Sequence, residues 1–411
     1  MAGSTQQLAV LLMAVVCSLH VWQAQAVYSG PNGVRPQGAR RRFATHQIIV
    51  KKRGQKPQLV NIANPGGSDA AVRAAVRKAA GERGVAYAEP NVFLYAARVP
   101  NDPSYATQQW HLPAVGAPAA WDKQYGNAKV TVCVVDSGIK YNHPDLSGDV
   151  KKDAKGVAIG ASFNVTNPGN YAPGFDDMGH GSHVAGIIGA YGNNAAGVAG
   201  INWRVSLISA KFLDSDGAGT AYGASLAIDW CNSQNATVIS MSAAGDDSSQ
   251  TMADSIARSN ALFFAAAGNS NSSTPVYPAG FSLPPWSLPN VISVAATQKD
   301  DSLAGFSNYG PSWVHLAAPG QSIYSTYGNP YFTSMQYIAM SGTSMATPLV
   351  SGAVALAYAQ RLTFTTKPPL TLQQMRNLLL QSVDVVPALN GKVSTGGRLN
   401  VTKLINGVGT I

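Results

Sequence analysis

The pattern of apolar and polar residues divides the chain into a large and a small region. Through most of residues 100–411, short runs that are apolar throughout alternate with longer stretches that have helical spacing. Runs of this kind are typical of parallel strands that helices cover on both faces. We therefore expect an α/β fold here, a doubly wound and mostly parallel sheet flanked by helices.

The expected elements of the large region follow one another in a regular order. The predicted strands cover residues 129–135, 205–212, 237–241, 261–267 and 291–296, and the predicted helices cover residues 180–190, 222–231 and 251–259. A further apolar helix begins near residue 344 and continues through Gly352 to Tyr358.

The small region, residues 46–96, predicts a strand, a helix and a second strand. Residues 46–51 and 85–95 have strand character, and residues 69–81 place Ala and Val at helical spacing with Arg and Lys opposite. A unit of about 50 residues buries little apolar surface and is marginal on its own. We expect it to need a partner surface.

The N-terminus carries an apolar run, residues 8–21, followed by Ala24-Gln25-Ala26. The run is shorter than the ~20 residues of a membrane span, and small residues follow it, so we interpret it as a signal peptide cleaved after Ala26 rather than an anchor. No later segment resembles a span, so the mature form is expected to be secreted or to reach a vesicle or vacuolar lumen. Four glycosylation sequons agree with this route; they begin at Asn164, Asn235, Asn271 and Asn400.

Charge is distributed unevenly along the chain. Residues 1–98 hold 13 Lys and Arg against 3 Asp and Glu, whereas residues 99–411 hold 16 against 17. The formal net charge of +9 therefore belongs to the N-terminal region, and the near-neutral remainder argues against nucleic-acid binding. Residues 27–44 are rich in Gly, Pro and Arg and indicate a linker. Its Arg40-Arg41-Arg42 is either a processing site or a solvated charge cluster.

Three segments combine residue types that carry chemistry. Asp136 follows a predicted strand, at the sheet edge where α/β proteins place their sites, although a turn-capping Asp would look the same. His180 begins a helix; His183 three residues later could make a metal pair, but no third ligand is grouped with them. Ser344 begins the apolar helix, where a plain N-cap is the simpler alternative.

Taken together, the three segments resemble the subtilisin-like serine proteases, the subtilase family (peptidase S8). The strings His-Gly-Ser-His-Val-Ala-Gly from residue 180 and Gly-Thr-Ser-Met-Ala-Thr-Pro from residue 342 carry the resemblance, with the order Asp, His, Ser. It extends from about residue 101 to residue 404. It implies a serine endopeptidase that works through an acyl-enzyme and requires no cofactor for its chemistry. Ser344 would be the nucleophile, His180 the base, and Asp136 the group that orients His180.

The resemblance also implies an oxyanion hole and two substrate-binding edges. Asn269, in Ala-Ala-Ala-Gly-Asn, would stabilise the oxyanion together with the Ser344 N–H. Extended protein or peptide substrates would pair with the two edges. The implied substrate-binding residues are Gly217, Gly219, Ser242, Ala243, Ala244, Gly245 and Val276.

Two positions depart from the family pattern. Many relatives have Leu-Gly in place of Ala243-Ala244, and Gly is frequent where this chain has Val276. We expect Val276 to fill part of the first specificity pocket and to disfavour large aromatic side chains there.

A dibasic processing protease is the alternative enzyme. It would use acids around the first pockets, and the candidates are Asp214, Asp216, Asp246 and Asp247. A catalytically inactive relative that only binds its partner is the non-enzyme alternative, but Asp136, His180, Ser344 and Asn269 are all present.

Calcium and a disulfide are further expectations that depend on the resemblance. Asp145 stands where many relatives bind structural calcium, and Asn194, in a short loop, is the second candidate ligand. Cys133 and Cys231 belong to adjoining strand–helix units, so they form either a disulfide or two buried thiols.

The small region resembles the family's inhibitory propeptide. The matching feature is Ala88-Glu89-Pro90-Asn91, and Pro100-Asn101-Asp102-Pro103 resembles a mature start. The implied organisation is a signal peptide (1–26), a linker (27–44), a propeptide (45–98) and a peptidase domain (99–411). The propeptide would be the domain's own inhibitor and chaperone, removed by self-cleavage near residues 97–99, and the mature enzyme would be a monomer.

Overall fold

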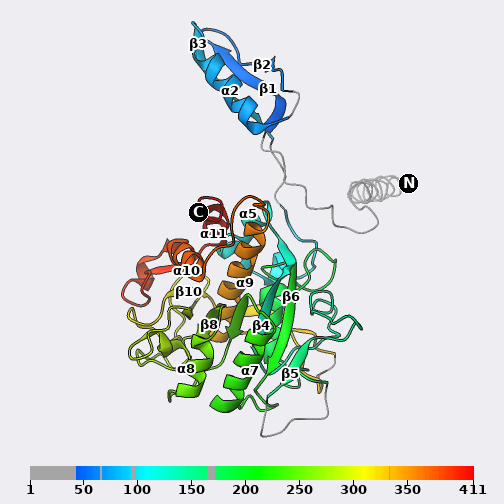
Figure 1. The fold of residues 1–411 in the computed structure, drawn as a ribbon, viewed down its shortest axis with the longest axis vertical. Coiled ribbons are helices and arrows are strands. Elements are labelled where there is room, and N and C mark those ends of the chain that lie inside the picture. Colours follow the sequence, from blue (N-terminus) through cyan, green and yellow to red (C-terminus); the bar gives the residue numbers. More distant parts are fainter. Residues whose placement is uncertain (1–42, 65–66, 94–97, 164–171, 333) are drawn as a thin grey trace, which may run out of the picture. The chain divides into compact units, whose positions relative to one another are not determined.

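The computed structural model describes residues 43–64, 67–93, 98–163, 172–332 and 334–411. The predicted signal peptide with Cys17, residues 27–42 of the linker and the sequon at Asn164 lie outside these residues. The chain divides into two compact units, residues 1–97 and 98–411 (Figure 1).

The small unit is a three-stranded antiparallel sheet with one helix. The strand order is β2-β1-β3, with β1 at Phe43–Lys52, β2 at Gln58–Asn61 and β3 at Val85–Val92. Helix α2, Asp69–Ala80, begins at Ser68, whose hydroxyl accepts a hydrogen bond from the Ala71 N–H at 3.2 Å. Strand β2 was not predicted because all four of its residues are exposed, so it lacks the alternation that marks a half-buried strand.

The large unit is built on a nine-stranded sheet of order β13-β14-β10-β9-β8-β7-β4-β6-β5. All neighbouring strands are parallel except the edge pair β13 and β14. The strands are β4 Gly126–Asp136, β5 Gly160–Ser162, β6 Arg204–Lys211, β7 Val238–Met241, β8 Leu262–Ala266, β9 Val291–Thr297, β10 Leu316–Pro319, β13 Val383–Val385 and β14 Gly397–Leu399. The predicted α/β fold is confirmed; the strands that sequence reasoning missed are those of three or four residues.

Helices cover both faces of this sheet. Helices α6 (His180–Gly189) and α9 (Thr343–Arg361) bury one hydrophobic cluster against it, and α7 (Ala221–Ser233) and α8 (Gln250–Ala257) bury a second. Along β4, Val134 belongs to the first cluster and Cys133 and Val135 to the second, which explains why the strand is apolar throughout. Helix α9, drawn in orange in Figure 1, contacts β4 and β7 to β10.

The remaining elements are short. They are α3 Tyr105–Gln108, α4 His111–Ala114, α5 Ala117–Trp121, α10 Leu372–Gln381, α11 Val401–Gly407, the hairpin of β11 Ile323–Thr326 with β12 Tyr337–Met340, and two 3₁₀ turns at Ala279–Ser282 and Pro387–Leu389. Within the described residues, no helix combines the length and apolar character needed to cross a membrane.

Strand β4 marks the point where the direction in which successive strands are added to the sheet reverses. Strand β6 pairs with one side of it and β7 with the other, although β6 and β7 are consecutive along the chain. In open α/β sheets, sites form beyond the carboxyl ends of the strands at such a switch point. Asp136 is the last residue of β4 and therefore lies at this position.

The small residues of α6 serve two different contacts. A Cβ on Gly181 would lie 2.2 Å from the carbonyl oxygen of Gly138 and 3.2 Å from Cβ of Asp136, so the helix start needs glycine to approach the end of β4. Gly186 instead faces Ser325 and Thr326 of β11. Gly186 therefore lets the hairpin β11–β12 approach this side of the helix.

The two remaining cysteines form a disulfide. It joins Cys133 of β4 to Cys231 of α7, with the Cα atoms 5.9 Å apart and a sequence separation of 98. Both residues are fully buried in the second hydrophobic cluster. The bond therefore ties a covering helix to the strand that carries Asp136.

Candidate active site

Asp136 and His180 lie in direct contact at the carboxyl end of β4. The Nδ1 atom of His180 is 2.7 Å from Oδ1 of Asp136, and the Asp136 side chain is fully buried. The same carboxylate oxygen accepts the Ser137 N–H at 2.7 Å. This contact fixes the imidazole ring and leaves its Nε2 atom for other partners.

The surroundings of His180 raise its pKa above the ordinary value. Burial by itself lowers the pKa, but the charge and hydrogen bond of Asp136 and the charge of Asp176 outweigh it. Both carboxylates favour the imidazolium form.

Asp176 was not singled out in the sequence, although it precedes the motif by four residues. It is fully buried, its Oδ1 atom accepts the N–H groups of Met178 and Gly179, and its Oδ2 atom accepts the N–H and hydroxyl of Ser182. Its charge therefore lies at the N-terminus of α6, where the helix dipole favours an anion. It anchors the segment that ends in His180.

Ser344 lies in the first turn of α9, next to Ser242. Its hydroxyl donates to the Ser242 carbonyl at 3.1 Å, and the Ser242 hydroxyl donates to the Ser344 carbonyl at 2.9 Å. Pro348 explains the second bond: it lies within α9 and has no N–H, so the Ser344 carbonyl four residues earlier has no helical donor. Because α9 begins at Thr343, Pro348 lies beyond the first turn of the helix.

Asn269 is held with its amide group facing the start of α9. Its Oδ1 atom accepts the N–H of Thr343 at 2.8 Å and the hydroxyl of Thr343 at 3.0 Å. A Cβ on Gly342 would lie 3.5 Å from both Nδ2 of Asn269 and the backbone nitrogen of Ser344. The two donors thus border one small space that a glycine keeps open.

The two predicted substrate edges extend from strand ends near the site. After β6, Asp214 holds its own loop by accepting the N–H groups of Asp216 (3.1 Å) and Ala218 (2.9 Å) through Oδ1, and Gly217 has a φ of 80°. After β7, Gly245 pairs with Tyr277 in an antiparallel bridge.

The residues between these edges differ in exposure. Ala244 and Gly219 are exposed and Ala243 is half-buried, whereas Val276 is only 9% exposed and packs beside Gly268, one residue before Asn269. Val276 therefore borders the loop that carries Asn269.

His183 points away from His180. Its Nε2 atom lies 3.0 Å and 3.1 Å from the carbonyl oxygens of Ile323 and Ile338 in the hairpin β11–β12, and complete burial lowers its pKa to about 3. No group of three His, Cys, Asp or Glu suited to a metal occurs among the described residues. The pair is therefore not a metal site: one ring belongs to the catalytic cluster and the other to the core.

The candidate calcium residues do lie together. Asp145 is buried; its Oδ1 accepts from Nδ2 of Asn194 and its Oδ2 from the Val198 N–H, both at 2.8 Å. Asp102 lies close by: burial, with a smaller contribution from the charge of Asp145, raises the pKa of Asp102 to about 6. The Oδ1 atom of Asp102 is buried without a hydrogen-bond partner. Two buried carboxylates with one unsatisfied oxygen fit a hard cation.

Sequence reasoning missed four residues that position this site: Asp102, Asp176, Lys211 and Thr343. Asp176 and Thr343 adjoin the motifs and could have been included with them. Lys211 ends an apolar strand, and nothing in its neighbours indicates a buried ammonium. Asp102 was used only as a marker of the mature start.

Comparison with known proteins gives a consistent result. Residues 127–404 match the model of the Subtilase family, Peptidase_S8. The chain is 39% identical over 279 residues to the thermophilic serine proteinase of Bacillus sp. (strain AK1), covering 67% of this chain and 64% of that protein. It is 36% identical over 264 residues to thermitase of Thermoactinomyces vulgaris, covering 64% and 86%. It is 36% identical over 296 residues to subtilisin NAT of Bacillus subtilis subsp. natto, covering 71% and 70%.

The match covers most of the large unit and includes Asp136, His180, Asn269 and Ser344. From the model match and these identities, the chain belongs to the subtilase family of serine-type endopeptidases.

Proposed function

We propose that this chain hydrolyses peptide bonds in protein or peptide substrates with Ser344 as nucleophile, His180 as general base and Asp136 as the group that orients His180. The observation that carries the proposal is the 2.7 Å contact between His180 and the buried Asp136 at the sheet's switch point. The three side chains supply the proton transfers and the covalent step, so the chemistry needs no cofactor.

The first step requires a small rotation of the nucleophile. The Ser344 hydroxyl donates to the Ser242 carbonyl. In the proposed step, rotation about the Cα–Cβ bond of Ser344 would redirect this proton toward Nε2 of His180. Ser344 Oγ then attacks the substrate carbonyl carbon as His180 takes its proton. The imidazolium, stabilised by Asp136, returns the proton to the leaving amine, which leaves an acyl-enzyme that water hydrolyses.

The charge on the attacked carbonyl oxygen would be stabilised by Asn269 and the Ser344 N–H. Both donors border the space beside Gly342, and Thr343 holds the Asn269 amide in this orientation before substrate arrives. Hydrogen bonds from donors that are already in place become stronger as negative charge develops on the oxygen in the transition state.

Substrate would lie extended between the edge at Gly217 and Gly219 and the edge at Ser242 to Gly245. Backbone pairing would give affinity, and the pocket bordered by Val276 would set side-chain preference. The burial of Val276 beside Gly268 supports a pocket too shallow for Phe or Tyr. Asp214 holds its own loop through Oδ1, whereas Asp216, Asp246 and Asp247 are exposed and remain the candidate acids of the dibasic alternative.

We further propose that Asp102, Asp145 and Asn194 hold one structural Ca²⁺. The Oδ1 atom of Asp102 is buried without a hydrogen-bond partner, and burial, with a smaller contribution from the charge of Asp145, raises the pKa of Asp102 to about 6, so a cation would stabilise the charged carboxylate there. Bound calcium would neutralise their charge and tie the start of the peptidase domain to the loop after α6.

The chain is proposed to be made as a secreted precursor that processes itself. Residues 1–26 would be the signal peptide, 27–44 the linker and 45–98 the inhibitory propeptide, removed by cleavage near residues 97–99. The division of the chain at residues 97 and 98 and the basic small unit support this organisation.

Kinetics of two variants test the proposed chemistry. We expect Ser344→Ala to lower kcat by about 10⁶-fold, and Asn269→Ala to lower it by about 10²–10³-fold with little change in KM, magnitudes known for this family. In the Ser344→Ala chain, the precursor should stay uncleaved when expressed without another protease. Normal maturation of that variant would contradict self-processing.

A further inference from the structure

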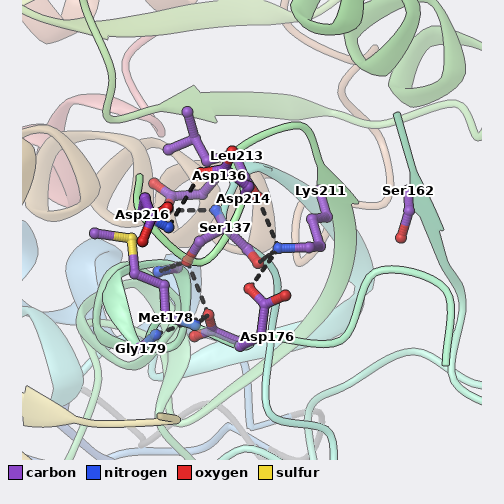
Figure 2. A network of polar contacts seen from close by, with 12 residues as sticks. Asp136, Ser137, Ser162, Asp176, Met178, Gly179, Lys211, Leu213, Asp214 and Asp216 are labelled. Carbon is purple, nitrogen blue, oxygen red and sulfur yellow. Dashed lines mark hydrogen bonds and ion pairs between the residues drawn. The ribbon is translucent and has the colours of Figure 1, made fainter. Parts of the chain in front are cut away.

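Lys211, the last residue of β6, buries a charged ammonium group beside the active site. Its side chain is 3% exposed, and its Nζ atom lies 2.7 Å from Oδ1 of Asp177. The same atom lies 2.8 Å from the carbonyl oxygen of Ser137 and 2.6 Å from that of Leu213 (Figure 2). These three acceptors use all three N–H donors of the ammonium. A buried charge is tolerated only when it is paired and hydrogen-bonded in this way.

The three acceptors belong to three different parts of the site. Ser137 directly follows Asp136, and Asp177 precedes His180 by three residues. Leu213 begins the loop that leads to Gly217 and the proposed substrate edge. One side chain therefore joins the segments that carry the acid, the base and the substrate contact.

The backbone connects the same strands at this level. Asp136 and Lys211 are register partners in neighbouring parallel strands, and the Asp136 carbonyl accepts the N–H groups of Phe212 (3.0 Å) and Leu213 (3.3 Å). Beyond this point the strands separate, and regular pairing can no longer fix the two loops.

Ser137 is held from both sides. Its carbonyl accepts from Lys211, while its hydroxyl donates to Asp176 at 2.8 Å and accepts the Gly181 N–H at 2.9 Å. Loss of Lys211 would free one side of this turn and would leave the Asp177 carboxylate, 8% exposed, without its cation.

We propose that Lys211 is a positioning residue that keeps the substrate edge in register with the Asp136–His180 pair. Through Leu213 it fixes where the loop to Gly217 begins, and through Ser137 and Asp177 it fixes the segments on either side of the triad. Substrates that occupy the edge then reach Ser344 in the attacking geometry. The inference rests on the substrate edge proposed above.

The role predicts a split between long and short substrates. A peptide anilide with four residues before the cut contacts the edge, whereas a single-residue ester reaches only the triad and the first pocket. Displacing the edge by about 1 Å costs on the order of 10²-fold in rate. We expect the variant Lys211→Met/Asp177→Leu to lose about this factor in kcat/KM on the long substrate, with a raised KM, and to lose much less on the ester.

Two further variants control for stability and for charge. Arg204→Met/Asp149→Leu removes an ion pair at the other end of β6, where Nε of Arg204, with a side chain 42% exposed, lies 3.3 Å from a buried Asp149. It should lower the melting temperature without changing the ratio of the two kcat/KM values. Lys211→Gln/Asp177→Asn keeps uncharged N–H donors near the carbonyl oxygens of Ser137 and Leu213. It should retain most of the ratio of kcat/KM on the long substrate to kcat/KM on the ester, and it can be measured even if the Met/Leu variant does not fold.

The outcomes distinguish failure of the proposed substrate edge from failure of the proposed role of Lys211. If the wild type itself shows no preference for the long substrate, the substrate edge is wrong and this inference falls with it. If the wild type prefers the long substrate and Lys211→Met/Asp177→Leu keeps its ratio, the edge stands and the role of Lys211 is overturned.

Discussion

Ser242 and Ser344 exchange two hydrogen bonds, each hydroxyl donating to the other residue's carbonyl. One of these carbonyls is available only because Pro348 has no N–H to offer it. The proposed substrate edge after β7 is thereby linked to the turn that carries Ser344, the proposed nucleophile. The proline within α9 is thus part of the active-site geometry.

This arrangement predicts non-additive effects of two substitutions. Ser242→Ala removes the donor to the partly buried Ser344 carbonyl, which costs about 1 kcal/mol. The turn that carries Ser344 should then shift toward another donor, and we expect kcat to fall by about 10-fold. Pro348→Ala supplies a helical N–H to the same carbonyl. In a double-mutant cycle, Ser242→Ala should cost clearly less in the Pro348→Ala background. Additive losses would show that the Ser242 hydroxyl acts elsewhere.

The pKa of His180 sets the acid side of the pH–activity profile. The base must be neutral, so a raised pKa moves the fall in kcat/KM to higher pH than an ordinary histidine would give. Asp176→Asn removes one of the charges that raise this pKa, and the acid limb should move to lower pH. The exposed Asp300→Asn serves as the control that should not move it. An unchanged limb in folded Asp176→Asn would contradict the assigned cause.

The width of the first pocket depends on Val276. We expect Val276→Gly to raise kcat/KM for substrates with Phe or Tyr before the cut relative to Ala, by 10-fold or more, since one or two methylenes in such a pocket are worth about 10–200-fold. Profiling with a peptide library measures this. Val314→Ala makes a cavity in the same hydrophobic cluster and should leave the profile unchanged. A wild type that already prefers Phe or Tyr would contradict the pocket assignment.

Calcium should stabilise the peptidase domain by mass action. Chelation is expected to lower the melting temperature and added Ca²⁺ to restore it, while equilibrium dialysis counts the bound ions. Asp102→Asn and Asp145→Asn should weaken binding, and Asp153→Asn, an exposed carboxylate that serves its own turn, should not. A melting temperature that does not respond to Ca²⁺ would rule the site out.

The sequence predicted the long buried strands and the residues that lie in recognisable motifs. Strands such as β4 and β6 are apolar on both faces, so their composition alone indicates a covered parallel sheet. The roles of Asp136, His180, Asn269 and Ser344 came from strings whose order resembles one family. Strands β2, β13 and β14 have three or four residues, which is too short for an alternation of apolar and polar residues to be recognised in the sequence.

Other features depend on contacts between distant segments. The bond of Ser242 to a carbonyl freed by Pro348 spans about a hundred residues, and Lys211 meets acceptors from three separate loops. A lysine at the end of an apolar strand is as easily solvent-exposed as buried. Only the fold shows that this one is enclosed by the site.

The most direct test of the central claim is active-site labelling with a fluorophosphonate, followed by mass spectrometry of the modified peptide. The account predicts one adduct, on Ser344, that blocks peptide hydrolysis and that is lost in His180→Ala. Hydrolysis that persists in Ser344→Ala, or an inactivating adduct on any other residue, would contradict it.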